Sequence, residues 1–242
     1  KEGKLQVEIA QLRYRLTRLT GQGIDLSRLA GGIGTRGPGE QKLETDRRHI
    51  RERISLLKQE LKEVEKHRGL IRENRQRSGS PMVAIVGYTN AGKSTLLNAL
   101  SGSDIYVENK LFATLDPTTR KVELPGGSEV LVTDTVGFIR KLPHHLVKAF
   151  YSTLEETKYA DLVLHVMDAS APSLDSHQKV VYETLEMLGA HEKPTIAVFN
   201  KIDKCEQESV HAITPVDAHV KISAKYNKNI PELLQEIENL LR

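Results

Sequence analysis

Gly87-Tyr-Thr-Asn-Ala-Gly92-Lys93-Ser94 is the stretch that decides the fold of this 242-residue chain. It matches the pattern GxxxxGK[ST], follows the apolar run Met82–Val86 and precedes a helical pattern over Ser94–Leu100. Between a strand and a helix, such a loop points backbone N–H groups at phosphates. The stretch therefore predicts a phosphate-binding loop at the first strand of an α/β domain.

Two side chains of this loop have expected roles of their own. The Lys93 ammonium would neutralise the β- and γ-phosphate oxygens, and the Ser94 hydroxyl would be a ligand of Mg²⁺. The residues expected to contact the nucleotide here are Gly87, Tyr88, Thr89, Asn90, Ala91, Gly92, Lys93, Ser94 and Thr95.

Short β-branched apolar runs alternate with helical segments after the loop, which is typical of a mostly parallel sheet wound with helices. The runs are Val130–Thr133, Leu162–Met167, Thr195–Phe199 and His219–Ile222. Lys121–Leu124 and Glu129–Val132, joined through a Pro-Gly-Gly turn, predict a hairpin that supplies one antiparallel edge strand.

Asn200-Lys-Ile-Asp203 follows an apolar strand, where doubly wound sheets bind ligands. The Asp203 carboxylate can accept hydrogen bonds from N1–H and the exocyclic amine of guanine, a donor pair that adenine lacks on that edge. We expect Asn200 to tie this segment to the phosphate loop and the Lys201 stem to cover the base. Ser223-Ala-Lys225 would complete the pocket with a backbone N–H. The base-reading set is thus Asn200, Lys201, Ile202, Asp203, Ser223, Ala224 and Lys225.

Two further segments should respond to the γ-phosphate. Asp134 would hold Mg²⁺ through water, and the Gly137 N–H would touch the γ-phosphate. A threonine should close over the metal, and Thr114 is favoured, with Thr118 as the alternative; the predicted metal ligands are Ser94 and Thr114. The residues expected at the nucleotide here are Phe112, Ala113, Thr114, Leu115, Asp116, Asp134, Thr135, Val136 and Gly137.

Phe138 stands where many switch GTPases carry a glutamine that orients the attacking water. A phenyl ring cannot do that chemistry, so hydrolysis should be slow without help. Asn90 could bind a monovalent cation such as K⁺ beside the phosphates, or could merely stiffen its loop. The catalytic candidates are Lys93, Asn90, Gly137 and Thr114.

The first third of the chain has a different pattern. Apolar residues recur at alternating spacings of four and three, from Leu5 to Leu19 and again from Leu43 to Ile71. They predict an antiparallel helical hairpin, or coiled coil, over residues 1–77, with helices of about twenty and about thirty residues. A hinge at 78–81 would lead to the nucleotide domain at 82–242. Residues 1–80 carry 19 Lys and Arg against 11 Asp and Glu, a net charge of +8, whereas residues 81–242 have a net charge of −5.

A glycine-rich loop is expected at 21–40, between the two helices. It holds seven glycines between Gly21 and Gly39, more than a helix connection needs. Basic residues surround it, which is the electrostatic pattern of phosphate-backbone binding. The predicted RNA contacts are Arg28, Arg36, Lys42, Arg47 and Arg48.

Cysteine content and hydropathy indicate the cellular compartment in which the protein is expected. Cys205 is the one cysteine, so there is no disulfide framework, and a reduced cytoplasmic compartment is expected. The longest apolar runs are too short to span a bilayer, so no membrane insertion is predicted. Lys1 falls directly into a helical pattern, and we expect the sequence to begin inside a longer protein.

Together these motifs, Phe-Ala-Thr-Leu-Asp-Pro-Thr-Thr-Arg120 and the hairpin segment Gly32-Ile-Gly-Thr-Arg-Gly-Pro-Gly-Glu40 resemble the HflX family of translational GTPases. The resemblance implies a doubly wound P-loop GTPase domain preceded by an α-helical hairpin, without the family's N-terminal α/β subdomain. It implies hydrolysis of GTP to GDP with Mg²⁺, K⁺ assistance through Asn90, and binding of the large ribosomal subunit and its rRNA. It also implies dissociation of stalled or idle ribosomes under stress.

The sequence leaves two alternatives open. The hairpin could be a GTP-regulated coiled-coil module that binds another protein and has no RNA role. The chain could also be an RNA-remodelling ATPase, which Asp203 disfavours.

Overall fold

The computed structural model describes residues 2–29, 38–102, 118–135, 137–138, 157–205 and 210–242. The described contacts divide the chain into two compact units, and the division along the sequence falls between Asn74 and Arg75. Each unit has its own apolar core, so each is considered by itself.

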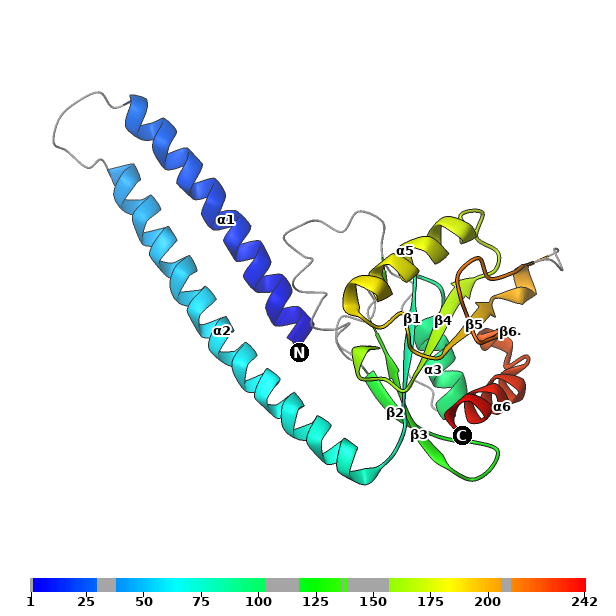
Figure 1. Cartoon of the computed structure of the whole chain (residues 1–242). Coiled ribbons are helices and arrows are strands. Elements are labelled where there is room, and N and C mark those ends of the chain that lie inside the picture. Colours follow the sequence, from blue (N-terminus) through cyan, green and yellow to red (C-terminus); the bar gives the residue numbers. More distant parts are fainter. Residues whose placement is uncertain (1, 30–37, 103–117, 136, 139–156, 206–209) are drawn as a thin grey trace. The chain divides into compact units, whose positions relative to one another are not determined.

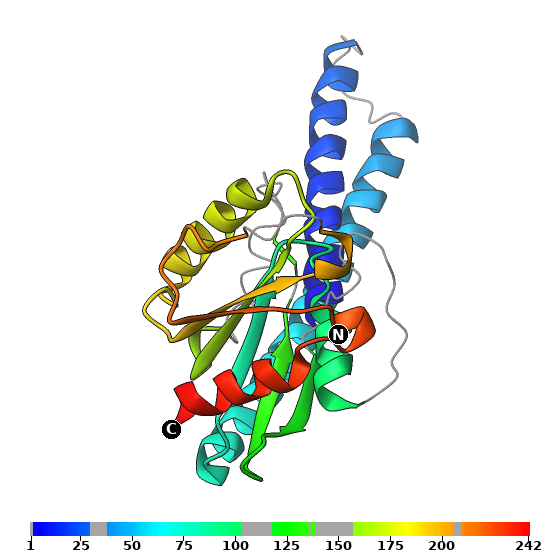
Figure 2. The ribbon, with the colours of Figure 1, turned by 90° about the vertical axis from the view of Figure 1, so that its right-hand side faces the viewer.

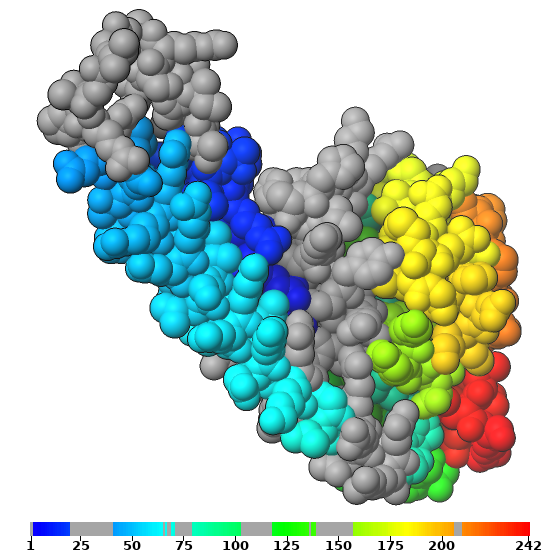
Figure 3. All heavy atoms as spheres, turned by 60° about the vertical axis from the view of Figure 1, so that its left-hand side comes forward, coloured from blue at the N-terminus to red at the C-terminus, as the bar shows by residue number. Residues whose placement is uncertain are grey.

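The first unit is a hairpin of two long helices, α1 (Glu2–Leu29) and α2 (Pro38–Ser78). They run antiparallel (Figures 1 and 3), and the apolar cluster between them joins residues 5–12 of α1 to residues 50–64 of α2. The buried seam consists of Leu5, Ile9, Ile54 and Leu57, flanked by the half-buried Leu12, Ile50, Leu61 and Val64. These are members of the four-and-three pattern, so the hydrophobic spacing builds the seam directly.

The predicted loop bounds of 21–40 are wrong, because α1 continues through Gly21 and Gly23 to Leu29 and α2 already begins at Pro38. An interior glycine costs a helix only about 1 kcal/mol relative to alanine, and the residues after Gly23 are ordinary helix formers. Proline is favoured at a first helical position, because its missing N–H has no intrahelical acceptor there. Residues 30–37 lie outside the described part of the chain.

Two arginines of α2 join the helices. One Nη of Arg47 donates to the Leu19 carbonyl oxygen at 2.6 Å. The Arg53 guanidinium donates through Nε and Nη2 to one carboxylate oxygen of Glu8, at 3.1 and 2.9 Å. Arg47 is therefore a structural contact within the hairpin as well as a predicted RNA contact, whereas Lys42 and Arg48 are exposed.

The second unit is built on a six-stranded sheet in the order β2-β3-β1-β4-β5-β6. β3, β1, β4, β5 and β6 are parallel, and β2 pairs antiparallel with β3 at one edge, as expected. The strands are β1 (Met82–Gly87), β2 (Thr118–Glu123), β3 (Glu129–Asp134), β4 (Leu162–Asp168), β5 (Thr195–Asn200) and β6 (Ala218–Lys221).

Helices cover both faces of the sheet (Figure 2). On one face lie α3 (Lys93–Ser101) and α6 (Ile230–Leu241), which share a core cluster with all six strands. On the other face, α5 (Leu174–Leu188) packs on β1 and β4. The central strands β1, β4 and β5 are buried on both faces, which explains why they read as nearly continuous apolar runs.

A buried carboxylate fixes the β2–β3 turn to the last helix. The Gly126 N–H donates to Glu238 Oε2 at 3.1 Å, and Arg242 donates to Glu238 Oε1 at 2.9 Å. Glu238 is only 6% exposed, so these bonds offset the cost of burying its charge. None of the described helices is long and apolar enough to cross a bilayer.

Candidate nucleotide-binding site

The carboxyl ends of four parallel strands meet at one edge of the sheet, and each carries a residue of the candidate site. β1 ends at Gly87, β3 at Asp134, β4 at Asp168 and β5 at Asn200. Parallel strands all end at the same edge, so residues far apart in sequence are gathered there.

The phosphate loop turns back into α3 through backbone conformations with positive φ. Asn90 has a φ of 63° and Gly92 a φ of 94°. A Cβ at Gly92 would also lie 2.3 Å from Asn200 Nδ2, so this position has room only for hydrogen. The left-handed backbone at Asn90 costs little, because asparagine tolerates it better than most residues.

Lys93 is 6% exposed and opens α3. Its ammonium donates to the carbonyl oxygens of Gly87 and Tyr88, at 3.2 and 3.1 Å. Burial lowers the Lys93 pKa to about 8, and the neighbouring Asp134 carboxylate opposes that shift. The amine is thus held inside its own loop, and bound phosphates would stabilise its charged form.

Raising the pH above about 8 is expected to weaken nucleotide binding, because the Lys93 amine then loses its charge in the free protein. GDP affinity should be flat below that pH and fall by up to about tenfold per pH unit above it. Titration calorimetry from neutral pH to about pH 8.5, below the range in which guanine N1 loses its proton, measures this. An affinity that stays constant over the range would contradict the lowered pKa.

The same pKa has a consequence for the free protein. Between about 8 and the ordinary 10.5, the unfolded chain binds the Lys93 proton and the folded chain does not. The contribution of Lys93 to the free energy of unfolding therefore rises with pH across that window.

Ser94 and Asp134 lie together beside Lys93. Ser94 Oγ donates to Asp134 Oδ2 at 2.6 Å. A hydroxyl and a carboxylate oxygen this close are the hard oxygen ligands that Mg²⁺ prefers, so the pair fits a magnesium site shared with substrate phosphates. The described residues contain no cluster of three or more His, Cys, Asp or Glu that could hold a metal by itself.

The segment after β3 is joined to the phosphate loop by backbone hydrogen bonds. The Phe138 N–H donates to the Gly87 carbonyl at 3.0 Å, and the Thr89 N–H donates to the Phe138 carbonyl at 2.8 Å. The Phe138 ring is 6% exposed and lies in a cluster with Val86 and Leu185 under α5. Phe138, at the position where many switch GTPases have a glutamine, is therefore part of the hydrophobic core.

Asn200 connects three segments through one buried amide. Its Nδ2 donates to the Ala91 carbonyl at 2.9 Å, so the expected tie to the phosphate loop is present. Its Oδ1 accepts from the N–H groups of Lys201 and Ala224, at 2.8 and 3.0 Å. The loop after β6 is thereby held beside the loop after β5.

Asp203 follows in a short 3₁₀ turn, and its Oδ1 accepts from Ser223 Oγ at 2.5 Å. Asp203 is exposed, so its carboxylate is accessible to a base. Ser223 is fully buried and is thus a fixed support for that carboxylate.

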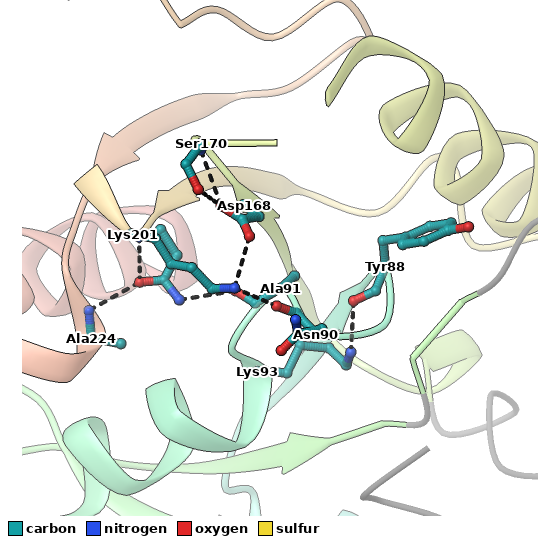
Figure 4. A network of polar contacts seen from close by, with 9 residues as sticks. Tyr88, Asn90, Ala91, Lys93, Asp168, Ser170, Lys201 and Ala224 are labelled. Carbon is teal, nitrogen blue, oxygen red and sulfur yellow. Dashed lines mark hydrogen bonds and ion pairs between the residues drawn. The ribbon is translucent and has the colours of Figure 1, made fainter. Parts of the chain in front are cut away.

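Asp168, at the end of β4, was missed by the sequence-based prediction. Its Oδ2 accepts from the Lys201 ammonium at 2.7 Å, and its Oδ1 accepts from the N–H and hydroxyl of Ser170. Burial alone would raise the Asp168 pKa, but these contacts outweigh it and hold the pKa below its ordinary value. The same ammonium donates to the Asn90 carbonyl at 2.7 Å, so Lys201 bridges β4 and the phosphate loop (Figure 4). The available signal was an aspartate directly after an apolar strand, as at Asp134.

The other predicted residues divide into described and undescribed ones. The Thr135 hydroxyl donates to the Ile85 carbonyl at 2.7 Å, so it supports the sheet. The Tyr88 ring stacks on His177 of α5, with centroids 3.7 Å apart. Burial raises the pKa of the Cys205 thiol, helped by Asp168 and Asp203. Outside the described residues lie Phe112, Ala113, Thr114, Leu115, Asp116 and Val136.

Two family models match the chain. Residues 1–75 match the GTP-binding GTPase Middle Region, and residues 82–201 match a family described as 50S ribosome-binding GTPase. The first model covers the helical unit, and the second covers the sheet unit as far as Lys201.

Curated relatives cover the whole chain. The protein named GTPase HflX of Caldanaerobacter subterraneus subsp. tengcongensis is 62% identical over 243 residues, which cover 100% of this chain and 55% of that protein. GTPase HflX of Lacrimispora saccharolytica is 58% identical over 242 residues, or 100% of this chain and 57% of that protein. The chain therefore spans somewhat more than half the length of these relatives.

A solved structure has the same fold. It is a GTP-binding protein from the hyperthermophilic archaeon Sulfolobus solfataricus in complex with GDP, 27% identical, with a TM-score of 0.64. The match covers 99% of this chain and 66% of that chain.

Proposed function

Because this chain belongs to the HflX family of GTPases, we propose that it binds GTP and hydrolyses it to GDP, coupled to binding of the large ribosomal subunit. The observation that carries the guanine assignment is the exposed Asp203 carboxylate, supported by the buried Ser223. It lies next to Asn200, whose amide is bonded directly to the phosphate loop. The residue proposed to bind the base is thereby held at a fixed position relative to the phosphate loop.

Binding would use groups that the fold already positions. Asp203 accepts from guanine N1–H and the exocyclic amine, while the Lys201 stem covers the base. N–H groups of the loop and of the α3 N-terminus hold the phosphates, and Lys93 leaves its carbonyl partners for them. Ser94, with Asp134 through water, would hold Mg²⁺, which supplies charge neutralisation at the β- and γ-phosphates.

Hydrolysis proceeds without a side chain at position 138 that can orient water, because the Phe138 ring is buried beneath α5. The Gly137 N–H and the phosphate loop remain as positioning groups. We propose that Asn90 helps to bind K⁺ beside the phosphates. Its side chain is exposed, and its backbone carbonyl is held in place by the Lys201 ammonium. A cation there would offset charge that develops in the transition state.

The partner we propose for the hairpin is the RNA of the large ribosomal subunit. Arg13, Arg15, Arg18, Lys42, Arg48 and Arg51 are all exposed on α1 and α2. Such a set neutralises phosphates, as the basic balance of residues 1–80 predicts. We further propose that engagement separates stalled or idle ribosomes in the cytoplasm during stress, with the GTP-bound form engaged.

Purified large subunits are expected to raise the GTP turnover of this chain by at least about tenfold in K⁺ buffer, which is well below the about 10³- to 10⁵-fold effect of a partner that supplies an arginine finger. The double variant Lys42→Ala with Arg48→Ala should lose most of that stimulation while keeping its intrinsic turnover. Each lost phosphate contact also lowers the salt dependence of binding by about one unit of log–log slope. Phosphate release measures turnover, and cosedimentation measures binding.

Three controls separate the outcomes. Lys179→Ala removes an exposed charge from α5 and should leave the stimulation intact. Equal turnover in K⁺ and Na⁺ buffers would reject K⁺ binding through Asn90 but would leave the proposals of GTP hydrolysis and ribosome binding standing. Absence of stimulation by subunits would reject the ribosomal partner and favour a protein-binding hairpin instead.

A further inference from the structure

Thr89, the third residue of the phosphate loop, carries an unusual hydroxyl. The residue is 8% exposed, and Oγ1 is buried without a hydrogen-bond partner among the residues that the structure describes. Native proteins seldom bury a hydroxyl without a partner, because the lost contacts with water are not replaced. A group of this kind in a binding loop indicates a partner that arrives with the ligand.

The position of Thr89 is fixed from two directions. Its N–H donates to the Phe138 carbonyl, and its own Cα and Cβ lie against Gly137. A Cβ built on Gly137 would be 3.1 Å from Thr89 Cβ and 2.9 Å from Lys93 Nζ. The threonine side chain, the Gly137 backbone and the lysine ammonium therefore converge on one small volume.

That volume is where the proposed function requires the γ-phosphate. Lys93 serves the β- and γ-phosphates, and the Gly137 N–H is the group expected to report the γ-phosphate. GDP would bring no oxygen atoms to this side of the loop, whereas GTP would bring three. A hydroxyl can donate to any of them.

We propose that the Thr89 hydroxyl donates a hydrogen bond to the γ-phosphate and so makes the site favour GTP over GDP. The inference rests on the proposed function and assigns a side-chain role beyond the backbone contacts of the loop. Phe138 has no polar side chain to offer on this side of the site. Thr89 supplies one, since it directly follows Tyr88, which forms an isolated parallel bridge with Phe138.

Thr89→Val is the decisive variant, because valine keeps the branched shape and loses only the hydroxyl. Its affinity for a non-hydrolysable GTP analogue should fall about 10- to 100-fold with Mg²⁺ present, the range for one hydrogen bond to a charged group. Its GDP affinity should stay within about twofold of the wild type. Thr89→Ser, which restores the hydroxyl, should regain most of the preference for the GTP analogue.

Thermal unfolding of the nucleotide-free protein supplies a second readout. Replacing an unpartnered buried hydroxyl by a methyl group is neutral or stabilising, so the melting temperature of Thr89→Val should not fall. An unchanged ratio of GTP-analogue to GDP affinity in Thr89→Val would overturn the inference alone. Failure of the wild type to bind guanine nucleotides would instead overturn the proposed function.

Discussion

Asp203→Asn is expected to lower the affinity for GTP and GDP by about 100-fold or more, the scale on which a site built for particular hydrogen bonds rejects a mismatched partner. The asparagine amide would turn one acceptor into an NH₂ group that faces the guanine amine. Xanthine carries a carbonyl there, so xanthosine diphosphate should bind the variant better than GDP does. Competition against a fluorescent nucleotide measures both affinities in one assay.

Ser223→Ala is the matched control. It removes the hydroxyl that donates to Asp203 Oδ1 but leaves the carboxylate in place. It should weaken GDP binding by about tenfold at most, the effect of one hydrogen bond, and preserve the preference for guanine over xanthine. Unchanged guanine selectivity in Asp203→Asn would show that another group reads the base.

Gly137→Ala is expected to reduce GTP turnover by about 100-fold, comparable to the loss of one preorganised donor at a reacting centre. The added Cβ would lie 2.8 Å from Thr89 Cα and 2.9 Å from Lys93 Nζ. The ammonium can swing aside, but Thr89 Cα is backbone and cannot move without disturbing the phosphate loop. The Gly137 N–H would then be displaced from the γ-phosphate.

Comparison with GDP isolates the cause of that loss. GDP affinity should fall less than GTP-analogue affinity, because the strain is concentrated on the γ-phosphate side. Gly69→Ala is a suitable control, since a Cβ at this helical glycine meets nothing within 4 Å and alanine favours helix. Wild-type turnover in Gly137→Ala would show that the backbone at this position is not close to the reacting phosphate.

Much of the fold follows from local patterns, with specific exceptions. The predicted parallel strands end within a residue or two of the observed ones, because β1, β4 and β5 are apolar on both faces and are bounded by polar residues. The hairpin seam follows from its spacing. The strand order does not follow from local patterns, since it depends on which face of the sheet each connecting helix covers. The end of α1 differs from the prediction because Gly21 and Gly23 indicated a loop, whereas the helix continues through them.

The candidate site was predictable where a motif implies a backbone shape, as in Gly87–Ser94, or a bonding pattern, as at Asn200. Asp168 also follows an apolar strand, which could have marked its position, but no local sequence pattern reports its contact with the Lys201 ammonium. The structural use of Arg47 was missed for the same reason, since its acceptor is a backbone carbonyl 28 residues away. Contacts between distant segments are the part that a single sequence conceals.

The contacts of the Asn200 amide and of the Lys201 ammonium differ in how well they would survive substitutions. Lys201 has two acceptors, so losing Asp168 still leaves the Asn90 carbonyl. Asn200 accepts twice and donates once from a side chain that is 2% exposed, and no other residue type has that shape with both functions. A substitution at Asp168 therefore leaves Lys201 with one acceptor in the phosphate loop. A single substitution at Asn200 would instead disconnect the base-binding segments from the phosphate loop.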